Sequence, residues 1–324
     1  MAQDYIFAAA RTRVLELALY SDQTIEELLK TPSYEAALSF LREHGWGDSS
    51  IENSSEEEIL SYEENKTRKT VEELAAGNHT AFLVLSLPKI FHNLKAALKT
   101  LIFGGIDAKI YYDNTNPSYE DILSKLHDKN FASLPSYMQA PAKEAYEALL
   151  HTKDGQLMDC IIDRGTLVAI KEEAQKSPEK LVAKYGELLV ATADIKIALR
   201  GARTKKSEDF FKRALAPCDS LNIARLTEAA KQGEDRVLEY LKTTRFSDAS
   251  ESYQISPSVF ECWCDNQIIQ MIQPEKYDSF TLGTVVAYQL ARQNEIKTVR
   301  IILSGKRNNL PEENLRERIR RMYV

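Results

Sequence analysis

Few residues of this chain have the types and spacing that a catalytic or metal-binding site requires. Cys262-Trp263-Cys264 supplies two thiols, whereas a closed zinc site needs four ligands, and no other Cys or His lies nearby in the sequence. Gly104-Gly105 lacks the spacing of the glycine loops that bind phosphate. The sequence contains no nucleophile elbow and no His-Glu-x-x-His motif. It therefore predicts a protein without catalytic residues, metal or cofactor, in which these cysteines pack in the core and these glycines end a helix.

The charged residues indicate a different chemistry, the binding of a protein partner. Residues 291–324 hold nine Lys or Arg and four Glu. The arginines at 316, 318, 320 and 321 do not share one helix face, so two interpretations stay open: solvated charges that complement a helix C-terminus, or a basic surface for an acidic partner. The net charge of −6 argues against nucleic acid as a partner. Residues 48–64 hold seven Asp or Glu and no Lys or Arg, which indicates a solvated loop or helix face, with a basic partner or a cation as the alternative.

An internal repeat organises the rest of the chain. Lys95, Lys196 and Lys297 are spaced 101 residues apart, and each follows a polar and an aliphatic residue. A glycine follows each segment, at 104, 201 and 305, and is expected to end a helix there. Residues 37–42 match residues 237–242 at a shift of 200, which is close to twice that spacing. We therefore expect three helical repeats, at residues 1–106, 107–204 and 205–324. The three lysines are then equivalent and either flank a common axis or lock adjacent repeats, with exposed helix lysines as the alternative.

The pattern of apolar residues predicts an all-α fold without strands. Helices are expected at 5–20, 67–103, 178–200, 258–272, 283–304 and 312–323, with a break or bend at Pro88 and a polar loop at 247–258. Phe7, Ala10, Val14 and Leu17 form one stripe on the first of them. The apolar run 81–87 stops before Pro88 and is too short to cross a membrane, and no signal peptide is recognisable. We therefore expect a cytoplasmic protein with reduced thiols that meets a membrane only through its partners.

Three segments together resemble one protein family, the C subunits of the V-type and A-type rotary ATPases, whose counterpart in the eukaryotic vacuolar enzyme is the d subunit. The segments are Tyr5-Ile6-Phe7-Ala8-Ala9-Ala10-Arg11-Thr12-Arg13-Val14-Leu15-Glu16, residues 286–306 with Glu295-Ile296-Lys297-Thr298-Val299-Arg300, and Leu310-Pro311-Glu312-Glu313-Asn314-Leu315-Arg316-Glu317-Arg318. The threefold repeat fits this family along the whole chain, and residues 105–190 match it loosely. The resemblance implies three similar helical domains arranged as a funnel around a pseudo-threefold axis.

The resemblance also implies a function without chemistry of its own. The wide mouth of the funnel would rest on the membrane rotor ring, its cavity would receive the tip of the central shaft, and the protein would carry torque between the ATPase head and the ion-carrying ring. It would be a monomer within a complex that is peripheral to the membrane, and the transported ion stays open. We predict eight partner-binding cations: Arg11, Arg13, Lys95, Lys196, Lys297, Arg300, Arg316 and Arg318.

Two other classes of protein remain as alternatives. A free-standing α-helical interaction scaffold, such as a tetratricopeptide array, would have a 34-residue period, which this sequence does not show. A helical enzyme would need a polar cleft that holds residues with strongly shifted pKa values.

Overall fold

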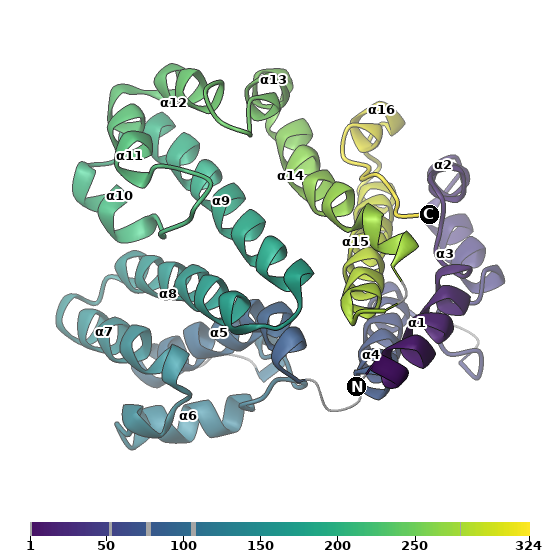
Figure 1. Ribbon diagram of the computed structural model, residues 1–324, viewed down its shortest axis with the longest axis horizontal. Helices are drawn as coiled ribbons and strands as arrows, with labels where there is room; N and C mark the ends of the chain where they lie inside the picture. The colour runs from purple at the N-terminus through teal and green to yellow at the C-terminus, as the bar shows by residue number, and fades with distance from the viewer. Residues whose placement is uncertain (1, 52–53, 76–78, 105–107, 279) are drawn as a thin grey trace. The chain divides into compact units, whose positions relative to one another are not determined.

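The computed structural model describes residues 2–51, 54–75, 79–104, 108–278 and 280–324, and in these ranges the chain contains α-helices and short 3₁₀ helices but no strand (Figure 1). The predicted all-α fold is confirmed. Glu52 of the acidic run, Gly105 and the predicted boundary between residues 106 and 107 lie outside the described residues.

The chain divides into two compact units. The first, here called the terminal unit, comprises Met1–His79, Glu179–Leu181 and Ser247–Val324. The second, the central unit, comprises Thr80–Pro178 and Val182–Phe246. The division into three sequence repeats, and their arrangement as a funnel, remain predictions.

The terminal unit joins the two ends of the chain around one long helix, α15 (Gly283–Arg307). Its apolar face packs against the first four helices, and Leu28, Leu41, Ile59, Val299 and Leu303 are among the fully buried core residues. Serines cap helices α2, α3 and α4 by accepting a backbone N–H of the first turn. The other elements of the unit are α1 (Ala2–Glu16), α2 (Asp22–Leu29), α3 (Tyr34–Glu43), α4 (Glu56–Leu74), α13 (Asp248–Ile255), α14 (Pro257–Ile272), η3 (Gln273–Tyr277) and α16 (Glu312–Arg316).

The central unit is built on two further long helices, α5 (His79–Phe103) and α9 (Lys180–Arg203). Phe91, Leu94 and Leu98 of α5 are fully buried. Helices α7 and α8 pack closely because Gly165 has no side chain: a Cβ there would lie 2.5 Å from the Cβ of Pro141. The remaining elements are η1 (Ala108–Ile110), α6 (Tyr119–His127), η2 (Phe131–Ser133), α7 (Ser136–Thr152), α8 (Gly155–Lys176), α10 (Glu208–Ala214), α11 (Ile223–Gln232) and α12 (Glu234–Leu241).

Several predicted element boundaries were wrong. The helical region 67–103 is two helices, and Pro88 lies inside the second one without ending it. The expected loop at 247–258 holds helix α13. The last helix stops at Arg316, and residues 317–324 run on mostly as irregular chain that side chains of other helices hold in place. At the C-terminal end, tertiary contacts outweigh the local preference for helix.

Two of the three glycines predicted to end a helix lie inside one instead. Gly104 follows α5 with φ +68°, as expected of a helix stop. Gly201 and Gly305, however, lie in the last turns of α9 and α15, which end two residues later at Arg203 and Arg307. A Cβ on Gly201 would lie 2.4 Å from the Phe211 ring, and a Cβ on Gly305 would lie 2.0 Å from Leu315. Each glycine therefore lets an apolar side chain ten residues further along pack across the long helix.

Replacing Gly201 by alanine should lower the free energy of unfolding by about 1–3 kcal/mol, because the buried Phe211 ring cannot move aside without disturbing the core. The matched control is Gly155→Ala at the start of α8, where an added Cβ meets nothing within 4 Å. Chemical denaturation of both variants measures the effect. An equal stability of the two variants would contradict the close packing at Gly201.

One helix among the described residues, Ala81–Phe103 within α5, is long and apolar enough to cross a membrane. The expectation that this apolar segment stops at Pro88 was therefore wrong. Of its most apolar window, 61% is buried inside the protein. Length and hydropathy of this kind are shared by the core helices of soluble proteins, and α5 buries Phe91, Leu94 and Leu98 in the central unit.

Candidate functional site

The polar residue that precedes each repeated lysine has the same role in all three long helices. These residues are two positions before the lysines, so they too are 101 residues apart, and all three are buried. Each accepts a backbone N–H from a connecting segment that leads toward a short helix. The pairs are Asn93 with the Tyr112 N–H at 2.8 Å, Asp194 with the Ala216 N–H at 3.0 Å, and Glu295 with the Tyr20 N–H at 2.9 Å. We call these three residues the anchors.

The third anchor joins the end of the chain to its beginning. Glu295 lies 275 residues after Tyr20, whereas the other two anchors precede the amide they bind. A buried side chain that accepts a backbone N–H removes the cost of leaving that amide unsatisfied. Three positions that the predicted repeat makes equivalent therefore bind a backbone N–H in the same way, while the repeat itself remains a prediction. Sequence reasoning recognised these residues as polar but did not assign them a role.

Two of the repeated lysines connect neighbouring helices. Lys95 of α5 pairs with Asp163 of α8, and Lys297 of α15 pairs with Asp265 of α14 at 2.6 Å. The Lys95 side chain is 24% exposed and the Lys297 side chain 49% exposed. Lys196 lies half-buried on α9. The structure thus uses Lys95 and Lys297 to link helices, while the equivalence of all three around an axis remains a prediction.

The predicted cations at the chain termini also have partners within the protein. Arg13 is held inside the terminal unit, where it pairs with Glu16 at 2.7 Å and donates to two backbone carbonyls near η3. Arg11 lies 3.7 Å from Glu73, and Arg316 lies 2.7 Å from Glu26.

Arg300 and Arg318 complete the predicted set of eight. Arg300 on α15 pairs with Glu64 at 2.8 Å. The exposed Arg318 side chain has no ion pair among the described residues. Arg11, Arg13, Arg300 and Arg316 thus each have an ion-pair partner within the terminal unit, and the role of the eight cations in partner binding remains a prediction.

A buried ionic network connects α15 to the first part of the chain. Arg292 donates to Glu295 at 2.7 Å and also to Glu63 of α4, and all three side chains are buried. Glu63 accepts the Gly47 N–H at 2.9 Å, and the Arg292 guanidinium stacks 4.4 Å from the Trp46 ring. Burial raises the pKa of Glu295, and Arg292 and the Tyr20 N–H counteract this rise.

The acidic run 48–64 is therefore not a solvated surface throughout. Three of its glutamates pair with arginines of α15: Glu56 with Arg307 at 3.3 Å, Glu63 with Arg292, and Glu64 with Arg300. Ser55 and Glu58 form a capping box at the start of α4. The basic partner of this segment is the chain's own last long helix, a contact that residues more than 200 positions apart in sequence cannot reveal.

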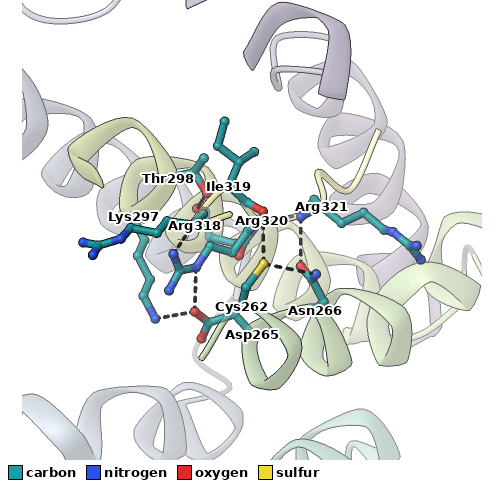
Figure 2. A network of polar contacts seen from close by, with 10 residues as sticks. Cys262, Asp265, Asn266, Lys297, Thr298, Arg318, Ile319, Arg320 and Arg321 are labelled. Atoms are coloured by element: carbon teal, nitrogen blue, oxygen red, sulfur yellow. Dashed lines mark hydrogen bonds and ion pairs between the residues drawn. The ribbon is translucent and has the colours of Figure 1, made fainter. Parts of the chain in front are cut away.

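The C-terminal segment 317–324, here called the tail, is fixed by polar contacts with α14 (Figure 2). Arg320 donates to Asp265 at 2.8 Å, and this carboxylate also receives Lys297. Burial would raise the pKa of Asp265, but Lys297 and Arg320 outweigh it and lower that pKa. The backbone is held as well, because Asn266 accepts the Arg321 N–H at 2.8 Å and the Cys262 thiol donates to the Ile319 carbonyl at 3.0 Å.

The cysteines and the remaining clefts offer little chemistry. Cys262 and Cys264 are buried in α14, as expected for cysteines that pack in the core. No group of three or more His, Cys, Asp or Glu side chains suited to a metal ion occurs in the described part of the chain. A shallow pocket of about 350 Å³ between α7, α8 and α10 is lined by Glu144, Glu147, His151 and Arg213 among others.

The apolar stripe predicted on the first helix is exposed in the structure. The apolar stripe of a surface helix normally faces the core. Here the side chains of Phe7, Val14 and Leu17 are 66%, 66% and 85% exposed. Tyr277 and Phe280 are also exposed, and they flank Asp278, whose carbonyl accepts a hydrogen bond from Arg13 of α1. Large exposed apolar groups of this kind mark surfaces that contact other molecules.

Comparison with known proteins adds an independent observation. The model of a family described as ATP synthase (C/AC39) subunit matches residues 8–318. The chain is also 24% identical over 320 residues to the C subunit of the V-type sodium ATPase from Enterococcus hirae. That match covers 95% of this chain and 95% of the relative.

Proposed function

Because the chain belongs to the ATP synthase (C/AC39) subunit family, which comprises the C subunits of V-type and A-type ATPases, we propose that it is a non-catalytic central-stalk adaptor. In this role it couples the rotating shaft of the ATPase head to the membrane rotor ring during ion transport. Its partners are then the proteins of the shaft and of the ring, and it reaches the membrane through the ring. The full-length family match is the observation that carries the proposal.

The structure supports an adaptor in two ways. Long helices that are cross-linked by buried anchors and ion pairs resist deformation, which suits a part that transmits torque. In addition, the apolar stripe of α1 is left exposed, as is usual for a protein that works within a larger assembly.

The partner-binding cations can be ranked by exposure. Arg13 and Lys95 are mostly covered and hold the protein itself together. Arg11, Lys297, Arg300 and Arg316 keep about half of their side chain exposed in the protein. Arg318 is exposed and has no ion pair among the described residues, so we propose it as the first cation that an acidic partner contacts.

Reversing the charge at Arg318 should weaken the binding of a shaft protein about tenfold at low salt, because a rim charge acts mainly through long-range attraction. The measurement is co-purification and titration of Arg318→Glu with the shaft and ring proteins of the same ATPase. Lys143→Glu, which changes an exposed lysine of α7, is the matched control and should bind as the unmodified protein does.

The outcome separates the adaptor from a free-standing helical scaffold. An adaptor is recovered together with the shaft and ring proteins. Failure of the unmodified protein to bind either of them would refute the proposed function, whereas equal binding of both variants would refute only the role of Arg318.

A further inference from the structure

The second anchor, Asp194, differs from the other two because one oxygen of its carboxyl group is buried without a hydrogen-bond donor among the described residues. Its Oδ1 accepts the Ala216 N–H at 3.0 Å, while its Oδ2 is buried without a hydrogen-bond partner among the described residues. The residue is 0% exposed. A buried carboxylate oxygen without a donor strongly disfavours the charged form.

The other two anchors do not place an uncompensated charge in the core. Asn93 is neutral at every pH, and its amide group both accepts from and donates to the backbone of residue 112. Glu295 is paired with Arg292 at 2.7 Å. Among the three equivalent anchors, therefore, only Asp194 is a titratable group without an ion pair that the structure records.

Charged groups around Asp194 come from the helices and the loop packed against it. Arg164 of α8 donates to the Leu215 carbonyl at 3.0 Å, so Arg164 and Asp194 hold the two ends of one peptide group. Glu187, earlier on α9, adds a like charge, and Cys218 lies in the same loop as Ala216. Lys171 is committed to Glu187 and Asp219.

Glu187 provides a comparison on the same helix. It accepts the Asp219 N–H at 2.9 Å and the Ser220 N–H at 2.7 Å, and it pairs with Lys171. Burial alone would raise the pKa of Glu187, but Lys171 and these N–H donors outweigh burial and lower that pKa to about 2. For Asp194, burial dominates over the Ala216 N–H and raises the pKa to about 7. The two carboxylates that bind the loop of residues 215–222 therefore have widely different pKa values.

We propose that Asp194 is a proton-controlled anchor for the loop 215–222 between α10 and α11, which is held more tightly when Asp194 is protonated and opens more readily when it is charged. The neutral carboxyl still accepts the Ala216 N–H but avoids a buried uncompensated charge. Loss of the proton places that charge in the core, and opening of the loop lets water reach it.

The sign follows from proton linkage. An open loop exposes Asp194, whose pKa then falls to about 4, the usual value in water. Between that value and about 7 the closed form binds the extra proton, so raising the pH favours opening. The equilibrium constant for opening should rise about tenfold between pH 6 and pH 8 and change little above pH 8.

Hydrogen exchange of the Ala216 amide in the full-length protein measures this opening directly. After correction for the intrinsic pH dependence of exchange, its protection factor should fall about tenfold between pH 6 and pH 8. The Tyr112 amide, held by the neutral Asn93, is a matched control within the same molecule and should keep a constant protection factor. In Asp194→Asn, the protection factor of the Ala216 amide should no longer depend on pH.

Three results would overturn the proposal. The first is a constant protection factor at Ala216. The second is a parallel fall at Tyr112, which would assign the effect to the whole unit. The third is a pH dependence that persists in Asp194→Asn. Should that variant fail to fold, Glu187→Gln serves in its place. It removes a like charge that raises the pKa of Asp194, so the fall in the Ala216 protection factor should remain but move to lower pH. Loss of that pH response would equally overturn the role of Asp194.

Discussion

Replacing Arg292 by methionine should lower the free energy of unfolding by about 3–5 kcal/mol at pH 7, the cost of leaving buried charges without their counter-ion. Arg292 is the cation shared by Glu63 and Glu295, and all three side chains are buried between α4 and α15. Methionine fills much of the same space, so the loss reports charge rather than a cavity. Urea denaturation followed by circular dichroism measures the difference.

The pH dependence of this variant provides a second test. Burial already raises the pKa of Glu295, and removal of Arg292 takes away the main group that opposes the rise. A carboxyl whose pKa is raised in the folded state favours folding at low pH. The loss in free energy of unfolding caused by Arg292→Met should therefore become smaller when the pH is lowered from about 7 to about 5.

A surface arginine on the same helix is the matched control. Arg300 pairs with Glu64 at 2.8 Å and keeps 53% of its side chain exposed. Arg300→Met should change the free energy of unfolding by less than about 1 kcal/mol, as is usual for exposed ion pairs. Equal losses for the two variants would show that the buried network does not stabilise the junction between the chain ends.

Replacing Asp265 by alanine should release the tail and lower the free energy of unfolding by about 3 kcal/mol. Asp265 receives both Lys297 and Arg320, and the Arg320 side chain is only 7% exposed. Without the carboxylate, Arg320 stays buried without its ion-pair partner or moves into solvent with the tail. Trypsin cleavage after Arg318 and Arg321 should accelerate, which mass spectrometry of the intact chain detects.

Two further variants test whether the effect comes from the ion pairs of Asp265. Asp265→Asn keeps an acceptor for Arg320 and should lose about half as much stability. Glu26→Ala removes the exposed partner of Arg316 and should leave the tail as resistant to trypsin as before. Rapid cleavage in Glu26→Ala, or none in Asp265→Ala, would contradict the role of Asp265 in holding the tail.

The helical class and the family were both available from the amino-acid sequence. Helix periodicity and the scarcity of Gly and Pro are local properties of the sequence, so they can be recognised without knowledge of tertiary contacts. The family was recognisable because its terminal motifs are contiguous, and the match over residues 8–318 confirms it. The 101-residue spacing likewise identified the three anchor positions, although not what they bind.

Helix ends and side-chain partners were decided by contacts between distant segments. Gly201 and Gly305 looked like helix stops, but in the structure Phe211 and Leu315 use the space that these glycines leave. The expected final helix stops at Arg316, and beyond it polar groups of α14 bind the backbone of the tail.

Charge was the property that sequence described least well. Lysines, arginines and glutamates look like solvated surface because nothing local shows which opposite charge lies beside them. Folding places α15 against α4, so Glu63 and Arg292 meet across 229 residues and become core groups. The sequence by itself determined the class and the family of this protein. Only the tertiary structure decided which of its charges are buried and paired, because the free energy of a charge depends on its surroundings and not on its neighbours along the chain.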